Sequence, residues 1–269
     1  MDKYLLYKQL VEDVKSYVIS SCSGKLPFDS YEKCDAINLW TYWQGRWVDH
    51  DGKVMHNLDA QILVVGQDWG APDVPAVSTV CQMMNGRSTH FNTDDTFLTG
   101  DDCFVNPTDD VLYQVMKTAL GYDISRSSLD CRHNRDLFFT NFFACFREEK
   151  NTGYLPIPNI KKEREFFARL VDLIHPKVIV CLGKKTLVEV CLSLDIDIKK
   201  SDLTPYSNFI GNRNKNPVGL AHTLVVFGMA HPGPQGTLNR VKNANPQTRA
   251  AGIAAQVEDW KRIKPYLEK

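Results

Sequence analysis

Three residues whose side chains can do chemistry lie at the ends of apolar runs. Asp68 follows the run ILVVGQ, Asn141 lies within DLFFTNFF, and His231 follows the run LVVFGMA. A carboxylate can orient water or stabilise a cation, and an imidazole can stabilise a developing anion. An amide presents a donor and an acceptor side by side, which matches the edge of a nucleobase. These residue types predict a site that binds a planar ligand and acts on it.

Each of the three residues also has a purely structural interpretation. Asp68 could cap the turn after its strand, and Asn141 could hydrogen-bond a neighbouring loop. A single histidine is more often structural than catalytic. His231, however, begins the sequence HPGPQG, whose prolines stiffen the backbone and whose glycines allow close approach. The functional interpretation requires the three side chains to meet at one edge of the fold.

Strands and helices alternate along the chain, which is the arrangement that would bring these residues together. Short apolar runs predict strands at 61–66, 136–143, 177–182 and 223–228. Apolar residues at helical spacing predict helices at 3–19, from a Thr108 cap to Gly121, at 160–175, at 184–193, and from Asn245-Pro246 onward. This order predicts an α/β fold, a three-layer α/β/α sandwich around a four-stranded, mainly parallel sheet. Such sheets bind ligands at the carboxyl ends of their strands.

The segments between these elements are less regular. Residues 22–60 carry Trp40, Trp43 and Trp47, which could stack on bases or, more commonly, pack a lid onto the sheet. A turn at Asp51-Gly52 predicts a small hairpin there. Residues 71–107 and 203–221 are predicted to be loops. We expect one domain over 1–269, with 1–58 as an N-terminal helical and tryptophan-rich decoration.

Composition limits the class of protein. The chain has 269 residues, 43% of them hydrophobic, with 32 basic and 32 acidic residues and therefore no net charge. Zero net charge gives no global attraction to nucleic acid or membrane. No apolar run is long enough to cross a bilayer, and the N-terminus lacks the pattern of a signal peptide, so we expect a cytoplasmic protein. None of the eight cysteines forms a C-x-x-C pair, and Cys181 and Cys191 are predicted to be core thiols.

Four segments in order resemble the uracil-DNA glycosylase superfamily. VVGQDWG at 64–70 resembles its first motif and HPGPQG at 231–236 its second. TNFFACFRE at 140–148 is similar to a stretch of the thermophile-type branch, and PKVIVCLGKKT at 176–186 is similar to the third strand and its turn. Each segment is short, but four in the right order are much more specific than one.

The resemblance implies hydrolysis of an N-glycosidic bond, without metal or other cofactor, after the nucleotide is flipped out of the stack. Asp68 matches the carboxylate that supports the water and the oxocarbenium-like sugar, and His231 matches the residue that stabilises the leaving base. Asn141 matches the base-reading asparagine, with backbone donors around Gly66 and Gln67. The implied partner is DNA containing a damaged or deaminated base, bound by a monomer with no membrane contact.

Several positions depart from the family pattern. Trp69-Gly70 replaces the Pro-Tyr that excludes thymine, so the choice of base stays open. Phe97 loosely matches the aromatic that stacks on the flipped base, with Phe91 as a rival. The iron–sulfur branch needs four cysteines. Cys145 matches one of them, but Glu163 stands near the place of another, so we expect no cluster.

The resemblance places DNA contacts on the loop that follows the last strand. Pro232, Gly233 and Gln235 are the candidates for pressing on the phosphates, and Gln235 replaces a leucine wedge. Arg240 is a candidate phosphate contact that could instead solvate the entry to a helix. Two other functions remain open on sequence alone: a non-catalytic nucleotide- or DNA-binding module, and, with less support, a small-molecule hydrolase.

Overall fold

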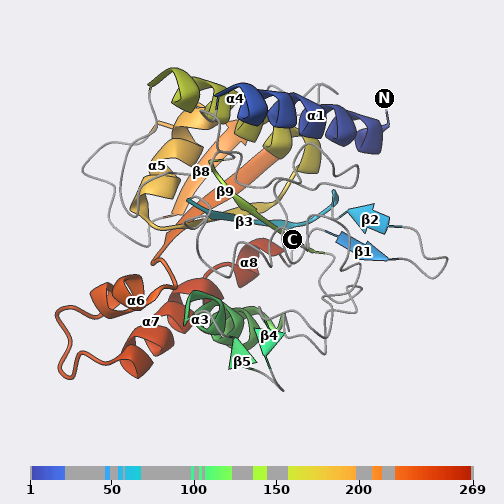
Figure 1. Cartoon of the computed structure of the whole chain (residues 1–269). Coiled ribbons are helices and arrows are strands. Elements are labelled where there is room, and N and C mark those ends of the chain that lie inside the picture. The colour runs from blue at the N-terminus through green and yellow to red at the C-terminus, as the bar shows by residue number, and fades with distance from the viewer. Residues whose placement is uncertain are drawn as a thin grey trace.

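The structure is a computed structural model, and element labels follow Figure 1. It describes residues 2–21, 46–48, 54–56, 58–67, 98–99, 103–104, 107–122, 136–143, 157–197, 208–213 and 222–267. Trp40, Trp43, Asp68 and Phe97 lie outside these ranges. None of the described helices is long and apolar enough to span a membrane.

A five-stranded sheet forms the centre of the molecule, in the order β6-β3-β7-β9-β8. The strands are β3 (Ile62–Gly66), β6 (Leu137–Asn141), β7 (Val178–Leu182), β8 (Asn208–Arg213) and β9 (His222–Met229). Pairing of β6, β3, β7 and β9 is parallel, which confirms the predicted mainly parallel sheet. The fifth strand corrects the expected loop at 203–221, because β8 pairs antiparallel with β9. An edge strand needs only one partner, so a short polar segment can form it.

Helices cover both faces of the sheet, which confirms the three-layer sandwich (Figure 1). One face carries α1 (Lys3–Ser21), α4 (Ile157–Ile174) and α5 (Lys184–Ser193). The other carries α3 (Pro107–Val115) with its π-helical continuation η1 (Met116–Leu120), α6 (Pro234–Arg240), α7 (Arg249–Lys261) and α8 (Lys264–Leu267). Strand side chains alternate between two cores: Leu63 and Val65 pack with α1, α4 and α5, whereas Ile62 and Val64 pack with α3 and α7.

Several helix boundaries differ from the sequence prediction. The helix expected to follow a Thr108 cap begins two residues earlier than expected, at Pro107, since proline fits the first turn of a helix. Its predicted end is confirmed, because Gly121 adopts the left-handed conformation with φ 81°. The last long helix begins at Arg249 and not at Asn245-Pro246, because the Thr248 hydroxyl caps it by accepting from the Ala251 amide at 3.1 Å.

Two small antiparallel pairs lie outside the main sheet. β1 (Arg46–Val48) pairs with β2 (Val54–His56), which confirms the predicted hairpin. β4 (Leu98–Thr99) pairs with β5 (Cys103–Phe104), in a stretch that was expected to be entirely loop. Such short pairs are hard to predict because their residues carry no long alternating pattern.

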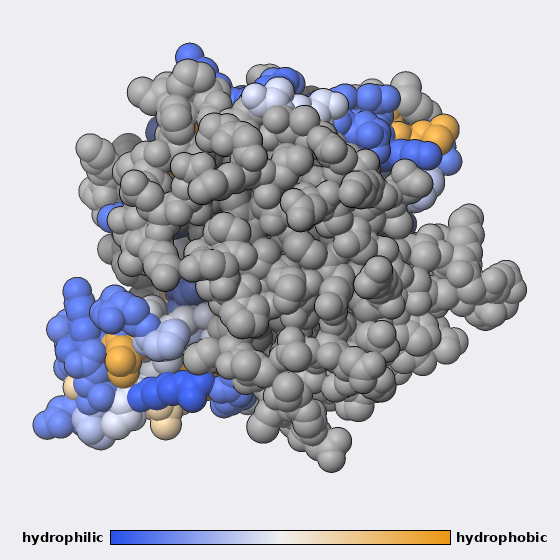
Figure 2. Space-filling view, viewed as in Figure 1, coloured by the Kyte–Doolittle hydropathy of each residue, from blue (hydrophilic) through white to orange (hydrophobic). Residues whose placement is uncertain are grey.

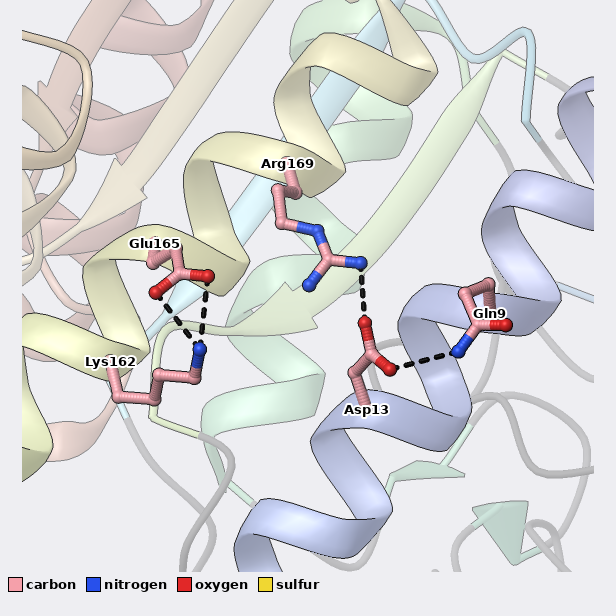
Figure 3. Close-up of polar contacts among 5 residues, drawn as sticks. All are labelled: Gln9, Asp13, Lys162, Glu165 and Arg169. Carbon is pink, nitrogen blue, oxygen red and sulfur yellow. Dashed lines mark hydrogen bonds and ion pairs between the residues drawn. The ribbon is translucent and has the colours of Figure 1, made fainter. Parts of the chain in front are cut away.

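The N-terminal helix is fixed to the sandwich by packing and by an ion pair to α4. Tyr7, Leu10 and Val14 are buried in the core beneath α1. In Figure 3, Arg169 of α4 reaches Asp13 of α1 at 2.6 Å, and Gln9 donates to the same carboxylate at 2.9 Å. Burial raises the pKa of Asp13, but the hydrogen bonds from Arg169 and Gln9 outweigh it and hold the pKa below the ordinary value.

Candidate functional site

The carboxyl ends of β3 and β6 run side by side and carry two of the predicted site residues. Gly66 pairs with Asn141 in the parallel register. The pairing continues beyond the strands, because Phe142 donates to the Gly66 carbonyl at 2.9 Å and Phe143 donates to the Gln67 carbonyl at 3.0 Å. The backbone that bears Gly66, Gln67 and Asn141 is therefore held rigidly at this edge.

The Asn141 amide lies directly over Gly66. Asn141 is only 6% exposed, and a Cβ added to Gly66 would come within 2.2 Å of Asn141 Oδ1. The same Cβ would lie 3.8 Å from Phe139, which belongs to the core shared with α3 and α7. Glycine at position 66 thus leaves the space that the amide occupies, on the α3 and α7 side of the sheet. Any larger residue would displace the amide.

His231 follows β9 at the same edge, and its protonation is defined by the backbone. The Gly233 amide donates to His231 Nδ1 at 2.9 Å, so Nδ1 is the acceptor and the neutral ring carries its proton on Nε2. The residue is exposed, yet protein atoms crowd the imidazole, and this desolvation lowers the pKa of His231 from its ordinary value. A neutral imidazole with its proton on Nε2 is a hydrogen-bond donor that does not need to be charged.

Tight contacts place the His231 loop over the end of β7 and beside α3. Gly183, at φ 100°, donates to the Met229 carbonyl at 2.8 Å, and its Cβ position would lie 3.9 Å from the His231 Cβ. The Cβ position of Gly233 is 3.2 Å from the Thr108 hydroxyl at the start of α3. The loop therefore reaches the same side of the sheet as Asn141.

The sheet order sets the distance between the amide and the imidazole. Asn141 ends β6 and His231 follows β9, with β3 and β7 between them. Three strand spacings correspond to about 14 Å between the two chain segments. The amide and the imidazole therefore lie at the same edge of the sheet, separated by the ends of two strands.

The predicted DNA-contact residues lie on the loop and helix after His231. Pro232 and Gly233 are buried, whereas Gln235 is exposed and donates to Asn239 of the same helix at 3.0 Å. Arg240 forms two hydrogen bonds to the Asp259 carboxylate of α7, at 2.6 and 2.9 Å. Arg240 therefore joins α6 to α7, and its contact with DNA stays a prediction. Figure 2 shows mostly hydrophilic surface over α6 and α7.

Other predicted residues fall outside the described part of the chain or in the core. Asp68 directly follows the described Gln67, and Phe97, with Phe91, belongs to the stretch after it, so their positions in the site stay predictions. Glu163 is buried in α4, 1% exposed, and Cys145 lies outside the described ranges, so the expected absence of a cluster also stays a prediction. The cysteine prediction is confirmed, because Cys181 and Cys191 are buried free thiols whose pKa values burial raises.

Sequence reasoning missed the residues that support the His231 loop. Thr108 was identified only as a helix cap, and Thr237 and Gln256 had no role at all. Thr237 donates to the Pro232 carbonyl at 3.1 Å and accepts from Gln256 at 3.0 Å. No spacing signal links positions 237 and 256, because the contact depends on how α6 crosses α7.

Fold and site residues together define a class of protein: an α/β sandwich with an amide and a neutral imidazole at the carboxyl edge of its parallel strands. The family model of the uracil DNA glycosylase superfamily matches residues 55–251 of the chain. The chain belongs to this superfamily, which confirms the resemblance, and its domain is of the DNA glycosylase type. Among curated proteins, none is similar enough to match the chain.

Proposed function

We propose that this protein is a DNA glycosylase that hydrolyses the N-glycosidic bond of uracil or of another altered base. The observation that carries the proposal is that two groups lie at one edge of the sheet. These are the Asn141 amide over Gly66 and an imidazole whose proton is on Nε2. Membership of the superfamily supports the reaction type. The identity of the base and the roles of the individual residues are parts of this proposal.

The leaving base is the part of the reaction that the described residues serve. Cleavage of the bond between base and sugar leaves electrons on the base, and a carbonyl oxygen of the base gains negative charge. His231 Nε2–H donates to that oxygen, and the hydrogen bond strengthens as the charge develops. Asn141 pairs with the donor and acceptor edge of the base and holds it in the site. The backbone at Gly66 and Gln67 forms the floor beneath the base.

The sugar is the part that Asp68 serves in this proposal. As the bond breaks, the sugar becomes oxocarbenium-like and positive. A carboxylate immediately after Gln67 stabilises that charge and orients the water that attacks C1′. The water supplies the new hydroxyl at C1′, and its remaining proton returns to the solvent or the departing base. Phe97 stacks on the base in this scheme.

Excision assays on labelled oligonucleotides test the proposal directly. The strands carry uracil, hypoxanthine, xanthine or hydroxymethyluracil, single- or double-stranded, and alkali reveals abasic sites. We expect abasic product from at least one of them. Replacing His231→Gln should lower kcat by about 10²-fold or more, as removal of an oxyanion donor does. Asp68→Asn should also lower kcat strongly while base binding persists. Asp59→Asn is the matched control, because Asp59 is exposed and pairs with Lys3 far from the site.

A non-catalytic base- or DNA-binding module is the second candidate. Zero net charge and the acidic residues Asp94, Asp95, Asp101 and Asp102 favour it, since they weaken attraction to phosphates. The two candidates differ in two measurements. A glycosylase that scans DNA loses affinity steeply as salt rises, and it yields abasic product. Binding of a free base with no product from any substrate would favour the module.

A further inference from the structure

One peptide group connects His231 to a buried hydrogen-bond chain behind it. The Gly233 N–H, which donates to His231 Nδ1, belongs to the peptide group whose carbonyl is that of Pro232. That carbonyl accepts from the Thr237 hydroxyl at 3.1 Å, and the hydroxyl accepts from Gln256 Nε2 at 3.0 Å. Because a peptide group is planar, fixing its oxygen also fixes the direction of its N–H. Thr237 therefore controls where the Gly233 N–H points.

The donors of this chain all point the same way. Thr237 has one hydroxyl proton and donates it to the Pro232 carbonyl, so the hydroxyl must accept from Gln256. Gln256 is only 1% exposed, and its side-chain carbonyl oxygen has no hydrogen-bond partner among the described residues. A buried acceptor without a partner is costly, and turning the amide over would satisfy it only by taking the Thr237 proton from the loop. The arrangement keeps the loop carbonyl bonded instead.

We propose that Thr237 and Gln256 are positioning residues that fix His231 in its Nε2–H tautomer. The inference rests on the proposed function for its catalytic consequence, but the tautomer itself can be measured without it. Thr237 and Gln256 are buried and lie behind the loop, so neither touches the substrate. They act through the Pro232–Gly233 peptide group, whose N–H donates to Nδ1 and so leaves the ring proton on Nε2.

Packing between α6 and α7 fixes this chain in place. A Cβ on Gly252 would come within 2.3 Å of the Thr237 carbonyl, so α7 touches α6 at its backbone. The Arg240–Asp259 ion pair joins the same two helices. Thr237 is fully buried, and its amide donates to the Gly233 carbonyl at 2.9 Å. The hydroxyl therefore has little freedom to take another partner.

Nitrogen chemical shifts of His231 in the full chain test the proposal. In Thr237→Val, which keeps the shape but removes the hydroxyl, we expect a mixture of the two neutral tautomers and a rise in the pKa of His231. Thr237→Ser keeps the hydroxyl and should restore the Nε2–H form. Thr186→Val is the matched control, because Thr186 is equally buried and also donates to a backbone carbonyl, that of Leu182 at 3.2 Å. It should leave the tautomer unchanged.

On a substrate that the wild-type protein excises, Thr237→Val should lower kcat by about tenfold with KM unchanged. This decrease is smaller than the one expected from losing the imidazole donor itself. Gln256→Met should have the same effect to a smaller degree. A His231 tautomer and pKa that stay at their wild-type values in folded Thr237→Val would overturn the proposal, as would equal changes in Thr186→Val. If no base is excised by the wild-type chain, the proposed function fails, while the shift measurement still decides the role of Thr237.

Discussion

Replacing Gly66 by alanine should separate folding from base recognition at the site. An added Cβ would lie 2.2 Å from Asn141 Oδ1, and an ordinary contact begins at 3.4 Å. The amide must therefore move by about 1.2 Å. Turning the amide over does not help, because Nδ2 then enters the same space. Asn141 must leave its rotamer or the strands β3 and β6 must separate, and the strands are held together by hydrogen bonds on both sides of position 66.

The expected effect follows from the size of this shift. A misplacement of about 1 Å can cost about 10²-fold in rate, so kcat/KM for the excised base should fall by about that factor. This corresponds to about 2.7 kcal/mol of transition-state stabilisation. Stability should change less, because overpacking costs about 1–3 kcal/mol and the added methyl returns about 0.4–1 kcal/mol through the unfolded chain. The variant should remain folded.

Excision rates and urea unfolding of the same preparations measure both quantities. Gly228→Ala is the matched control, because its Cβ would come within 2.6 Å of a Leu187 methyl group, on the opposite side of the sheet from Asn141. Both variants should lose similar stability, and only Gly66→Ala should lose activity. Wild-type excision and wild-type affinity for the free base in Gly66→Ala would refute the assignment of Asn141 to base recognition.

Three further changes test the electrostatics. The pKa of His231 lies below its ordinary value of 6.5, and only the neutral ring accepts from Gly233. We therefore expect kcat to be constant from neutral pH down to pH 6.5 and to fall at a pH below that value. The native chain binds fewer protons there, so stability also falls in that window; a pH–rate profile and unfolding curves check both. Asp13→Asn should cost about 0.5–1 kcal/mol, discounted for solvent at a half-exposed pair. The loss should vanish below the lowered pKa of Asp13, as urea unfolding at pH 7 and pH 2 would measure. Arg240→Ala should cost about 3 kcal/mol because it leaves the buried Asp259 unpaired, and a smaller salt dependence of DNA binding in this variant would show that Arg240 also contacts a phosphate.

The parallel core of the fold could be predicted because each of its strands is buried on both faces. Runs such as ILVV at 62–65 and VIVCL at 178–182 are continuous and apolar, which is what such strands require. Their order of appearance then placed Asn141 and His231 at one edge. β8 could not be predicted in this way, because an edge strand with the sequence NFIGNR needs no continuous apolar run. α6 was hidden by the prolines and glycines of HPGPQG, although Pro234 occupies the first turn, where proline is favoured.

The residue types of the site could be predicted, but the state of the imidazole could not. The sequence shows that a histidine follows β9. Whether its Nδ1 accepts a hydrogen bond depends on one peptide group. The direction of this group depends on Thr237, which depends on Gln256 nineteen residues further along the chain. A histidine without this support would divide its proton between two nitrogens and present a lone pair to the base part of the time. Because a donor is useful only when it already points at the charge that develops, the helix pair α6 and α7 is as much a part of the site as the strand ends are.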